Sequence, residues 1–180
     1  MLHLKRKKNK DKVNRSRGFT MIELIITIAI LSFGIIGIYS AFSPIIELTY
    51  TISIKFNAAY LAQEGLEIVR NIRDNNFINN ATWSAGLLSC ASGCQADYKT
   101  LTAVETAVNQ LQAYNPNNFL RLNADGFYSY DSGINTIFKR KITITQPSFA
   151  DNLKVDVSVM WDYNGKSFSF QTEEYIYNWY

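Results

Sequence analysis

Histidine and cysteine are scarce in this sequence of 180 residues. The only histidine is His3, which lies in a basic tail, and the only cysteines are Cys90 and Cys94. If the tail is removed, the rest of the chain cannot form a histidine-based catalytic triad, a zinc site with histidine ligands or an imidazole general base. We therefore expect a protein that is not an enzyme and that holds no metal and no cofactor.

Charge is unevenly distributed. The first 18 residues carry eight basic side chains and one acidic side chain, Asp11, whereas the rest carries ten basic and fourteen acidic side chains, a net charge near −4. A hydrophobic content of 47% and an aromatic content of 14% exclude an intrinsically disordered chain. Because the acidic body has no basic stripe to meet phosphate, we do not expect nucleic acid to be a partner.

A long apolar run follows the tail. The 23 residues from Leu24 to Ile46 contain no charged side chain, which is enough for a helix to cross a bilayer core about 30 Å thick. Positive charge on the N-terminal side alone predicts a cytoplasmic N-terminus and a globular domain outside. A secretory signal cleaved behind the run is not indicated, because the run is too long and no Ala-x-Ala site follows it. A plain uncleaved signal anchor remains the alternative.

The junction between the tail and the run carries a motif. It reads R-S-R-G-F-T-M-I-E-L over residues 15–24, and Glu23 lies inside the apolar face, where an isolated charge costs at least about 2.5 kcal/mol. This junction resembles that of the type IV pilin-like proteins, which include type IV pilins, minor pilins and type II secretion pseudopilins. Their signature is a basic leader ending in Gly, then Phe, Thr, a hydrophobe, any residue and Glu. The stretch from Gly18 to Glu23 matches it position by position, with Met21 where Leu is most frequent.

The resemblance implies a processing and assembly route. A prepilin peptidase would cut between Gly18 and Phe19 in the cytoplasm and methylate the new amine of Phe19. The apolar helix would stay on the mature protein, first in membrane lipid. The inner-membrane assembly machinery would then place it in a helical filament of pilin or pseudopilin subunits, at the cell surface or in the envelope.

The same resemblance gives Glu23 a role. Its carboxylate would pair with the Phe19 amine of a neighbouring subunit and set the axial register, since a carboxylate in an apolar bundle needs a partner. The alternative is that Glu23 only lies in the headgroup region, where the positive N-terminus of the helix stabilises it.

Resemblance and residue pattern together predict an α+β fold. A long N-terminal helix, half transmembrane and half amphipathic, would pack on a C-terminal antiparallel β-sheet, as in the pilin fold. The expected layout is a cleaved leader (1–18), a transmembrane and assembly helix (19–46), its amphipathic continuation (47–77), a variable loop region with the cysteine pair (78–118) and the sheet (119–180).

The amphipathic continuation has two irregular features. Pro44 should kink or briefly unwind the helix, and Thr49–Phe56 alternates with period two, which alone would suggest a strand. We expect helix there, with Arg70 in reach of both Glu67 and Asp74 on its polar face. The apolar stripe that follows has helical spacing: Ile54, Ala58, Leu61, Ala62, Leu66, Val69 and Ile72.

The loop region contains the segment C-A-S-G-C from Cys90 to Cys94. A zinc site would need two more ligands, and redox catalysis usually uses a two-residue spacing. Outside the cytoplasm a disulfide is the favoured interpretation, with two free thiols next and catalysis last. Weak helical spacing over Leu101–Tyr114 predicts a short helix.

The C-terminal part has strand patterns. Apolar and polar side chains alternate over 138–145 and 155–161, Asn164–Gly165 is a strong two-residue hairpin signal, and Tyr175–Tyr180 predicts a last strand. The F-x-R-x-I-x-I layout followed by V-x-V-x-W resembles, more loosely, minor pilins and pseudopilins.

Two remaining features could suggest a calcium site and an acid–base pair, but each has a simpler interpretation. The loop Asn123–Asp131 is rich in oxygen ligands, as some calcium sites are, but it does not fit the EF-hand pattern and predicts a solvated turn. The neighbours Glu173 and Glu174 point to opposite faces of a strand and do not form an acid–base pair.

Two classes of function follow. The first is a structural subunit, of the minor pilin or pseudopilin kind, in a type IV pilus-like or type II secretion filament. The second is a signal-anchored, exported ligand-binding or adhesive protein that does not polymerise.

Overall fold

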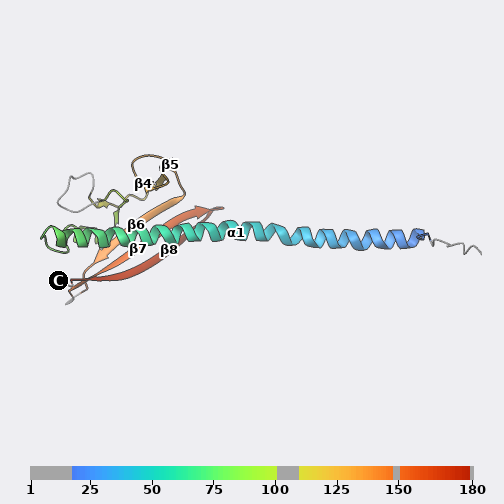
Figure 1. Ribbon diagram of the computed structural model, residues 1–180, viewed down its shortest axis with the longest axis horizontal. Helices are drawn as coiled ribbons and strands as arrows, with labels where there is room; N and C mark the ends of the chain where they lie inside the picture. Colours follow the sequence, from blue (N-terminus) through green and yellow to red (C-terminus); the bar gives the residue numbers. More distant parts are fainter. Residues whose placement is uncertain (1–17, 101–109, 148–150, 179–180) are drawn as a thin grey trace, which may run out of the picture. The chain divides into compact units, whose positions relative to one another are not determined.

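A computed structural model describes residues 18–100, 110–147 and 151–178 (Figure 1). The basic leader up to residue 17 lies outside these ranges. So does the first part of the segment for which the sequence predicts a short helix, Leu101–Tyr114.

The structure contains one long helix, α1 (Met21–Ile78), and an antiparallel sheet. The chain divides into two compact units, one ending at Leu48 and the other beginning at Thr49, and α1 contributes to both. In the second unit, α1 packs on the sheet, which confirms the predicted α+β fold. The other elements are η1 (Leu88–Cys90), β1 (Cys94–Gln95), β2 (Gln112–Ala113), β3 (Arg121–Leu122), β4 (Tyr128–Ser129), β5 (Ile134–Asn135), β6 (Phe138–Thr145), β7 (Asn152–Tyr163) and β8 (Lys166–Tyr177).

Helix α1 passes through both irregular features of its sequence. The backbone stays helical on both sides of Pro44, so of the two effects predicted there, a kink or a brief unwinding, the unwinding does not occur. Proline removes one backbone hydrogen bond, but propagating an existing helix costs far less than starting one. Thr49–Phe56 is helical as predicted, since the helical register places Ile54 in the buried stripe.

The main sheet has the order β2-β1-β6-β7-β8 with antiparallel pairing throughout. The hairpin prediction at Asn164–Gly165 is confirmed, because both residues have positive φ and Tyr163 pairs with Lys166 across the turn. Tyr175–Tyr177 is the end of β8, which runs unbroken from Lys166 to Tyr177, and is not a separate strand; residues 179–180 of that prediction lie outside the described residues. No Gly, Pro, Asn or Asp interrupts that stretch.

One of the short strands of the main sheet lies where the sequence predicts a helix, so that prediction is wrong. Gln112–Ala113, inside the segment predicted as helix, pairs as strand β2 with Cys94–Gln95. The backbone pairing offered by β1 overrides a weak helical periodicity here. A second, three-stranded sheet has the order β4-β3-β5.

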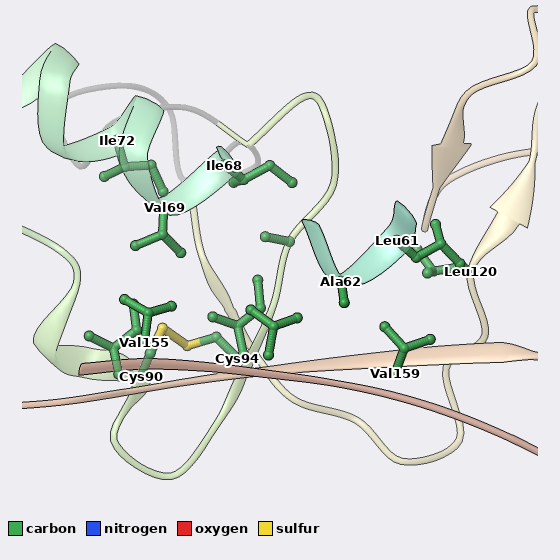
Figure 2. Close-up of a cluster of buried hydrophobic side chains, with 14 of the residues drawn as sticks. Leu61, Ala62, Ile68, Val69, Ile72, Cys90, Cys94, Leu120, Val155 and Val159 are labelled. Atoms are coloured by element: carbon green, nitrogen blue, oxygen red, sulfur yellow. A yellow bond between two sulfur atoms is a disulfide. The ribbon is translucent and has the colours of Figure 1, made fainter. Parts of the chain in front are cut away.

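The core of the second unit lies between α1 and the main sheet, as the close-up in Figure 2 shows. Six residues of the predicted stripe are buried and Leu66 packs against the core while partly exposed. The inward side chains of β6 and β7 face them: Phe138, Arg140, Ile142, Ile144, Leu153, Val155, Val157, Val159 and Trp161. The alternation of apolar and polar side chains in the sequence therefore corresponds to one buried and one solvent-exposed face of the sheet.

Gly65 allows α1 to approach the sheet closely. A Cβ at Gly65 would lie 2.9 Å from Cγ1 of Val157 and 3.2 Å from Cδ of Arg140. Glycine normally weakens a helix interior by about 1 kcal/mol relative to alanine. Close contact between the helix and β7 explains why glycine stands here.

We expect Gly65→Ala to lower the free energy of unfolding of the sheet domain by about 1–2 kcal/mol, because overpacking a core costs more than the gained helix propensity. Tryptophan fluorescence during denaturant unfolding of the full chain in detergent would measure the change. Gly37→Ala is the matched control, since a Cβ at Gly37 meets nothing within 4 Å. An alanine at 65 that leaves stability unchanged would contradict the close-packing argument.

Candidate functional site

The residues at the predicted cleavage point precede the helix. Thr20 caps α1: its Oγ1 accepts the backbone N–H of Glu23 at 3.3 Å, and its carbonyl accepts the N–H of Leu24 at 3.1 Å. Gly18 and Phe19 therefore lie outside the helix, and Phe19 is 82% exposed. The Gly18–Phe19 bond is in a non-helical, exposed stretch that a peptidase active site can reach.

Gly18 has no packing role within the chain. A Cβ at this position would meet nothing within 4 Å, and its backbone is not in the positive-φ region. Gly93, by contrast, has φ +108 and lies against the Lys141 side chain. Because the fold does not require glycine at 18, any requirement for it comes from an enzyme that reads this position.

Glu23 lies in the first turn of α1, where the helix dipole favours an acidic side chain. Its carbonyl accepts the hydroxyl of Thr27 at 2.7 Å. Over residues 18–100, 110–147 and 151–178, no ion pair involves the carboxylate of Glu23. A charge next to so apolar a helix needs a partner or water from beyond the residues that the structure describes.

The first part of α1 exposes nearly all its large apolar side chains. Ile30 is 67% exposed and Phe33 is 77% exposed, and the helix is long and apolar enough to cross a membrane. Two of its serine hydroxyls bond to the helix itself: Ser32 donates to the carbonyl of Ile28 at 2.8 Å, and Ser40 donates to the carbonyl of Ile36 at 2.9 Å. This apolar surface therefore suits lipid or other apolar helices.

A family model described as the prokaryotic N-terminal methylation motif matches residues 13–39. The chain carries the N-terminal motif of the type IV pilin-like proteins. The match spans the cleavage point, Glu23 and most of the apolar run, and it agrees with processing at this junction and with a membrane-anchored precursor. Neither the curated proteins nor the solved structures include a match to this pilin-like chain.

A buried arginine that the sequence analysis did not single out holds the globular part together. Arg140 is 0% exposed, and its guanidinium donates to the carbonyl of Leu61 and to Glu64 Oε2, each at 2.9 Å, as well as to the carbonyl of Ala96. It thus joins β6 to α1 and to the residue that follows β1. The sequence pattern could have revealed it, because Arg140 is the only charged residue among the side chains of β6 that alternate toward the apolar face.

Tyr130 extends this cluster. Its hydroxyl donates to the carbonyl of Arg140 at 3.3 Å, and its backbone N–H donates to Asp97 Oδ2 at 3.1 Å. Burial raises the pKa of Tyr130 to about 12. The phenol therefore stays protonated and remains a donor throughout the physiological pH range.

We expect Arg140→Ala to lower the free energy of unfolding by about 3–5 kcal/mol, because it leaves a cavity and strips a buried hydrogen-bonded group from three partners. Arg140→Met should cost much less, since methionine fills similar volume and Glu64, whose side chain is 32% exposed, can be hydrated. Denaturant unfolding of both variants measures the difference. A methionine variant as unstable as the alanine variant would contradict this explanation.

The polar face of α1 pairs differently from the sequence expectation. Arg70 contacts Glu67 as predicted, at 2.9 Å, but its second partner is Glu174 of β8, at 2.6 Å. Asp74 pairs with its neighbour Arg73 at 2.7 Å. The prediction that Arg70 would also reach Asp74 is wrong, because the inward carboxylate of β8 takes that place.

The paired acids of β8 point to opposite faces, as the strand period predicts. Glu174 turns inward to Arg70, whereas Glu173 turns outward to Lys154 at 2.9 Å. Lys154 also contacts Asp156 at 3.1 Å. The two carboxylates therefore belong to separate ion pairs and do not share a proton.

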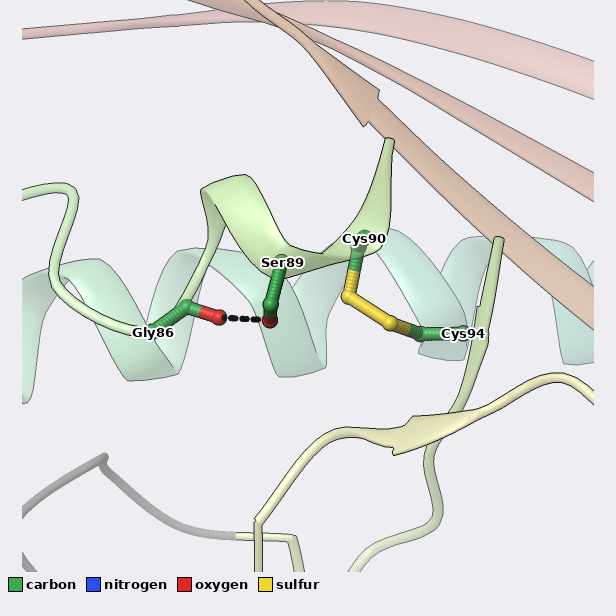
Figure 3. The surroundings of a disulfide bond; sticks show 4 residues. All are labelled: Gly86, Ser89, Cys90 and Cys94. Atoms are coloured by element: carbon green, nitrogen blue, oxygen red, sulfur yellow. Dashed lines mark hydrogen bonds between the residues drawn. A yellow bond between two sulfur atoms is a disulfide. The ribbon is translucent and has the colours of Figure 1, made fainter. Parts of the chain in front are cut away.

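Cys90 and Cys94 are joined by a disulfide, with their Cα atoms 5.1 Å apart (Figure 3). Both residues are buried. Cys94 begins β1, which pairs with Ile142 of β6, so the bond ties η1 to the sheet. Ser89 beside it donates to the carbonyl of Gly86 at 2.8 Å. The bond holds the loop region against the core.

The oxygen-rich loop from Asn123 uses its side chains for its own turn. Asn123 Oδ1 accepts the backbone N–H groups of Asp125 and Phe127, at 3.0 and 2.8 Å. Asp131 pairs with Lys99 at 3.0 Å. In the part of the chain that the structure describes, no group of three or more His, Cys, Asp or Glu side chains is placed to hold a metal ion.

Proposed function

We propose that this pilin-like chain is a structural subunit, of the minor pilin or pseudopilin kind, in a type IV pilus-like or type II secretion filament, and that it catalyses no reaction. The observation that carries the proposal is the junction at residue 18. An exposed, non-helical cleavage motif stands directly before an apolar helix whose large side chains are exposed.

The proposal has two stages. Before assembly, lipid covers the first part of α1, with residues 1–18 in the cytoplasm and the sheet domain outside. After cleavage, only similar apolar helices of other subunits can replace that lipid, which favours a filament with the helices in its core.

Glu23 would align the subunits. Cleavage creates an amine on Phe19 that stays cationic after a single methylation. The carboxylate of Glu23, which has no ion-pair partner within the described part of its own chain, complements the amine of a neighbouring subunit. An attraction between opposite charges in an apolar bundle penalises any sliding of one helix along another.

Mass spectrometry of the N-terminus in sheared filaments tests this function. We expect a chain that starts at N-methylated Phe19 and is enriched in the filament fraction. A chain that retains Met1 would support an uncleaved anchor. A chain processed at Phe19 that never leaves the membrane fraction would support the non-polymerising alternative.

A further inference from the structure

We propose that the β7–β8 hairpin end of the sheet domain is a membrane-surface contact, in which Tyr50, Tyr163 and Lys166 contact phospholipid headgroups before assembly. This inference rests on the proposed membrane-anchored stage and adds a second lipid contact beside the apolar helix.

The three residues form one cluster within the second unit. The rings of Tyr50 and Tyr163 have their centroids 5.2 Å apart, and Tyr50 remains 52% exposed. Tyr163 pairs with Lys166 across the tight Asn164–Gly165 turn, so the two side chains are cross-strand neighbours. Lys166 is exposed.

The covalent chain sets the distance from this cluster to the apolar run. The last residue of the charge-free stretch is Ile46, and Tyr50 follows four residues later, so the chain between them spans at most about 14 Å. A bilayer has a hydrocarbon core of about 30 Å within a total of about 40–45 Å. If the apolar run fills the core, the short chain keeps Tyr50 near the headgroup layer, and Tyr163 stays with it through their contact.

The sheet runs alongside the helix from this end. Arg70 contacts Glu174 at 2.6 Å, so β8 and α1 are tied at a second point far from the first. The twelve residues of β8 place Tyr177 about 36 Å along the strand from Lys166. Only the hairpin end of β8 is therefore close to the helix residues next to the apolar run.

The chemistry of the cluster suits a lipid surface. Tyrosine is enriched at membrane–water interfaces because its ring is apolar and its hydroxyl is wet, and lysine keeps its stem on apolar surface while its ammonium meets phosphate. Behind the cluster, the rings of Trp161 and Phe168 stack with centroids 5.9 Å apart. Trp161 and Phe168 form a cross-strand pair two positions from that of Tyr163 and Lys166, so the stacked rings stiffen the hairpin close to its turn.

Fluorescence quenching on the full chain tests the contact. The protein would be placed in nanodiscs of phosphatidylethanolamine and phosphatidylglycerol, with a fluorophore on one added cysteine in Lys166→Cys, Tyr177→Cys or Ile35→Cys. The native cysteines are bonded to each other and stay unlabelled. Lipids with a spin label on the headgroup should quench the label at 166 about threefold more than the label at 177, since quenching falls steeply with distance from the interface.

The label at 35 separates the two proposals. Lipids with a spin label deep in the acyl chain should quench it, which reports that α1 is inserted. Quenching at 35 together with equal, weak quenching at 166 and 177 would overturn the hairpin contact alone. Lack of quenching at 35 would overturn the membrane-anchored stage and the hairpin contact with it.

A double variant tests the tyrosines themselves. Tyr50→Ser with Tyr163→Ser should reduce headgroup quenching at 166 by about half, because the interfacial anchors are lost. The matched control, Tyr175→Ser with Tyr177→Ser, removes two exposed tyrosines from the far end of the strand and should leave that quenching unchanged. Equal loss in both double variants would overturn the assignment of the contact to the hairpin end.

Discussion

Replacing Glu23 by glutamine is expected to lower the share of processed protein found in sheared filaments by about two to three orders of magnitude. The change keeps the size of the side chain and removes its charge, so in the proposed filament the Phe19 amine of the neighbouring subunit would be buried without a counter-charge. Breaking one partner of a buried pair costs about 3–5 kcal/mol. Immunoblots of sheared and membrane fractions would measure the shares.

Membrane insertion and cleavage should survive in Glu23→Gln. Insertion should even improve, because a charged group leaves the apolar stretch, and the scissile bond lies outside the altered side chain. Glu67→Gln is the matched control, since Glu67 is an exposed partner of Arg70 in the sheet unit. Equal filament shares in wild type and Glu23→Gln would refute the register role, although the pilin-like identity would stand.

A leucine at position 18 is expected to stop processing, so that Gly18→Leu accumulates as uncut precursor with its basic tail. The chain itself has open space at this position, and the effect should therefore arise at the peptidase and not from misfolding. Gel mobility and the N-terminal mass of the membrane-bound protein would report it.

The control for this prediction is Gly37→Leu, which places the same side chain inside the apolar run, again with open space around it. That variant should be cut normally. Normal cleavage of Gly18→Leu would mean that the peptidase does not read residue 18, and the proposed processing route would then lose its main chemical support.

Local patterns in the sequence were sufficient for much of the fold. The strand alternation of β6 and β7 and the Asn164–Gly165 turn depend on side chains within a few residues of one another. Local patterns were misleading where a weak helical spacing competed with backbone pairing to a strand elsewhere in the chain. Gln112–Ala113 had weak helical spacing but forms a strand, because β1 supplies a pairing partner.

The sequence by itself determined the processing motif, the apolar run and the helix-then-sheet order, since each is expressed by neighbouring residues in a period or a fixed spacing. Only the tertiary structure decided the partners of Arg140, the close approach at Gly65 and the contact of Tyr50 with Tyr163. These features join residues far apart in the chain. Their geometry depends on how α1 lies against the sheet, which no local pattern specifies.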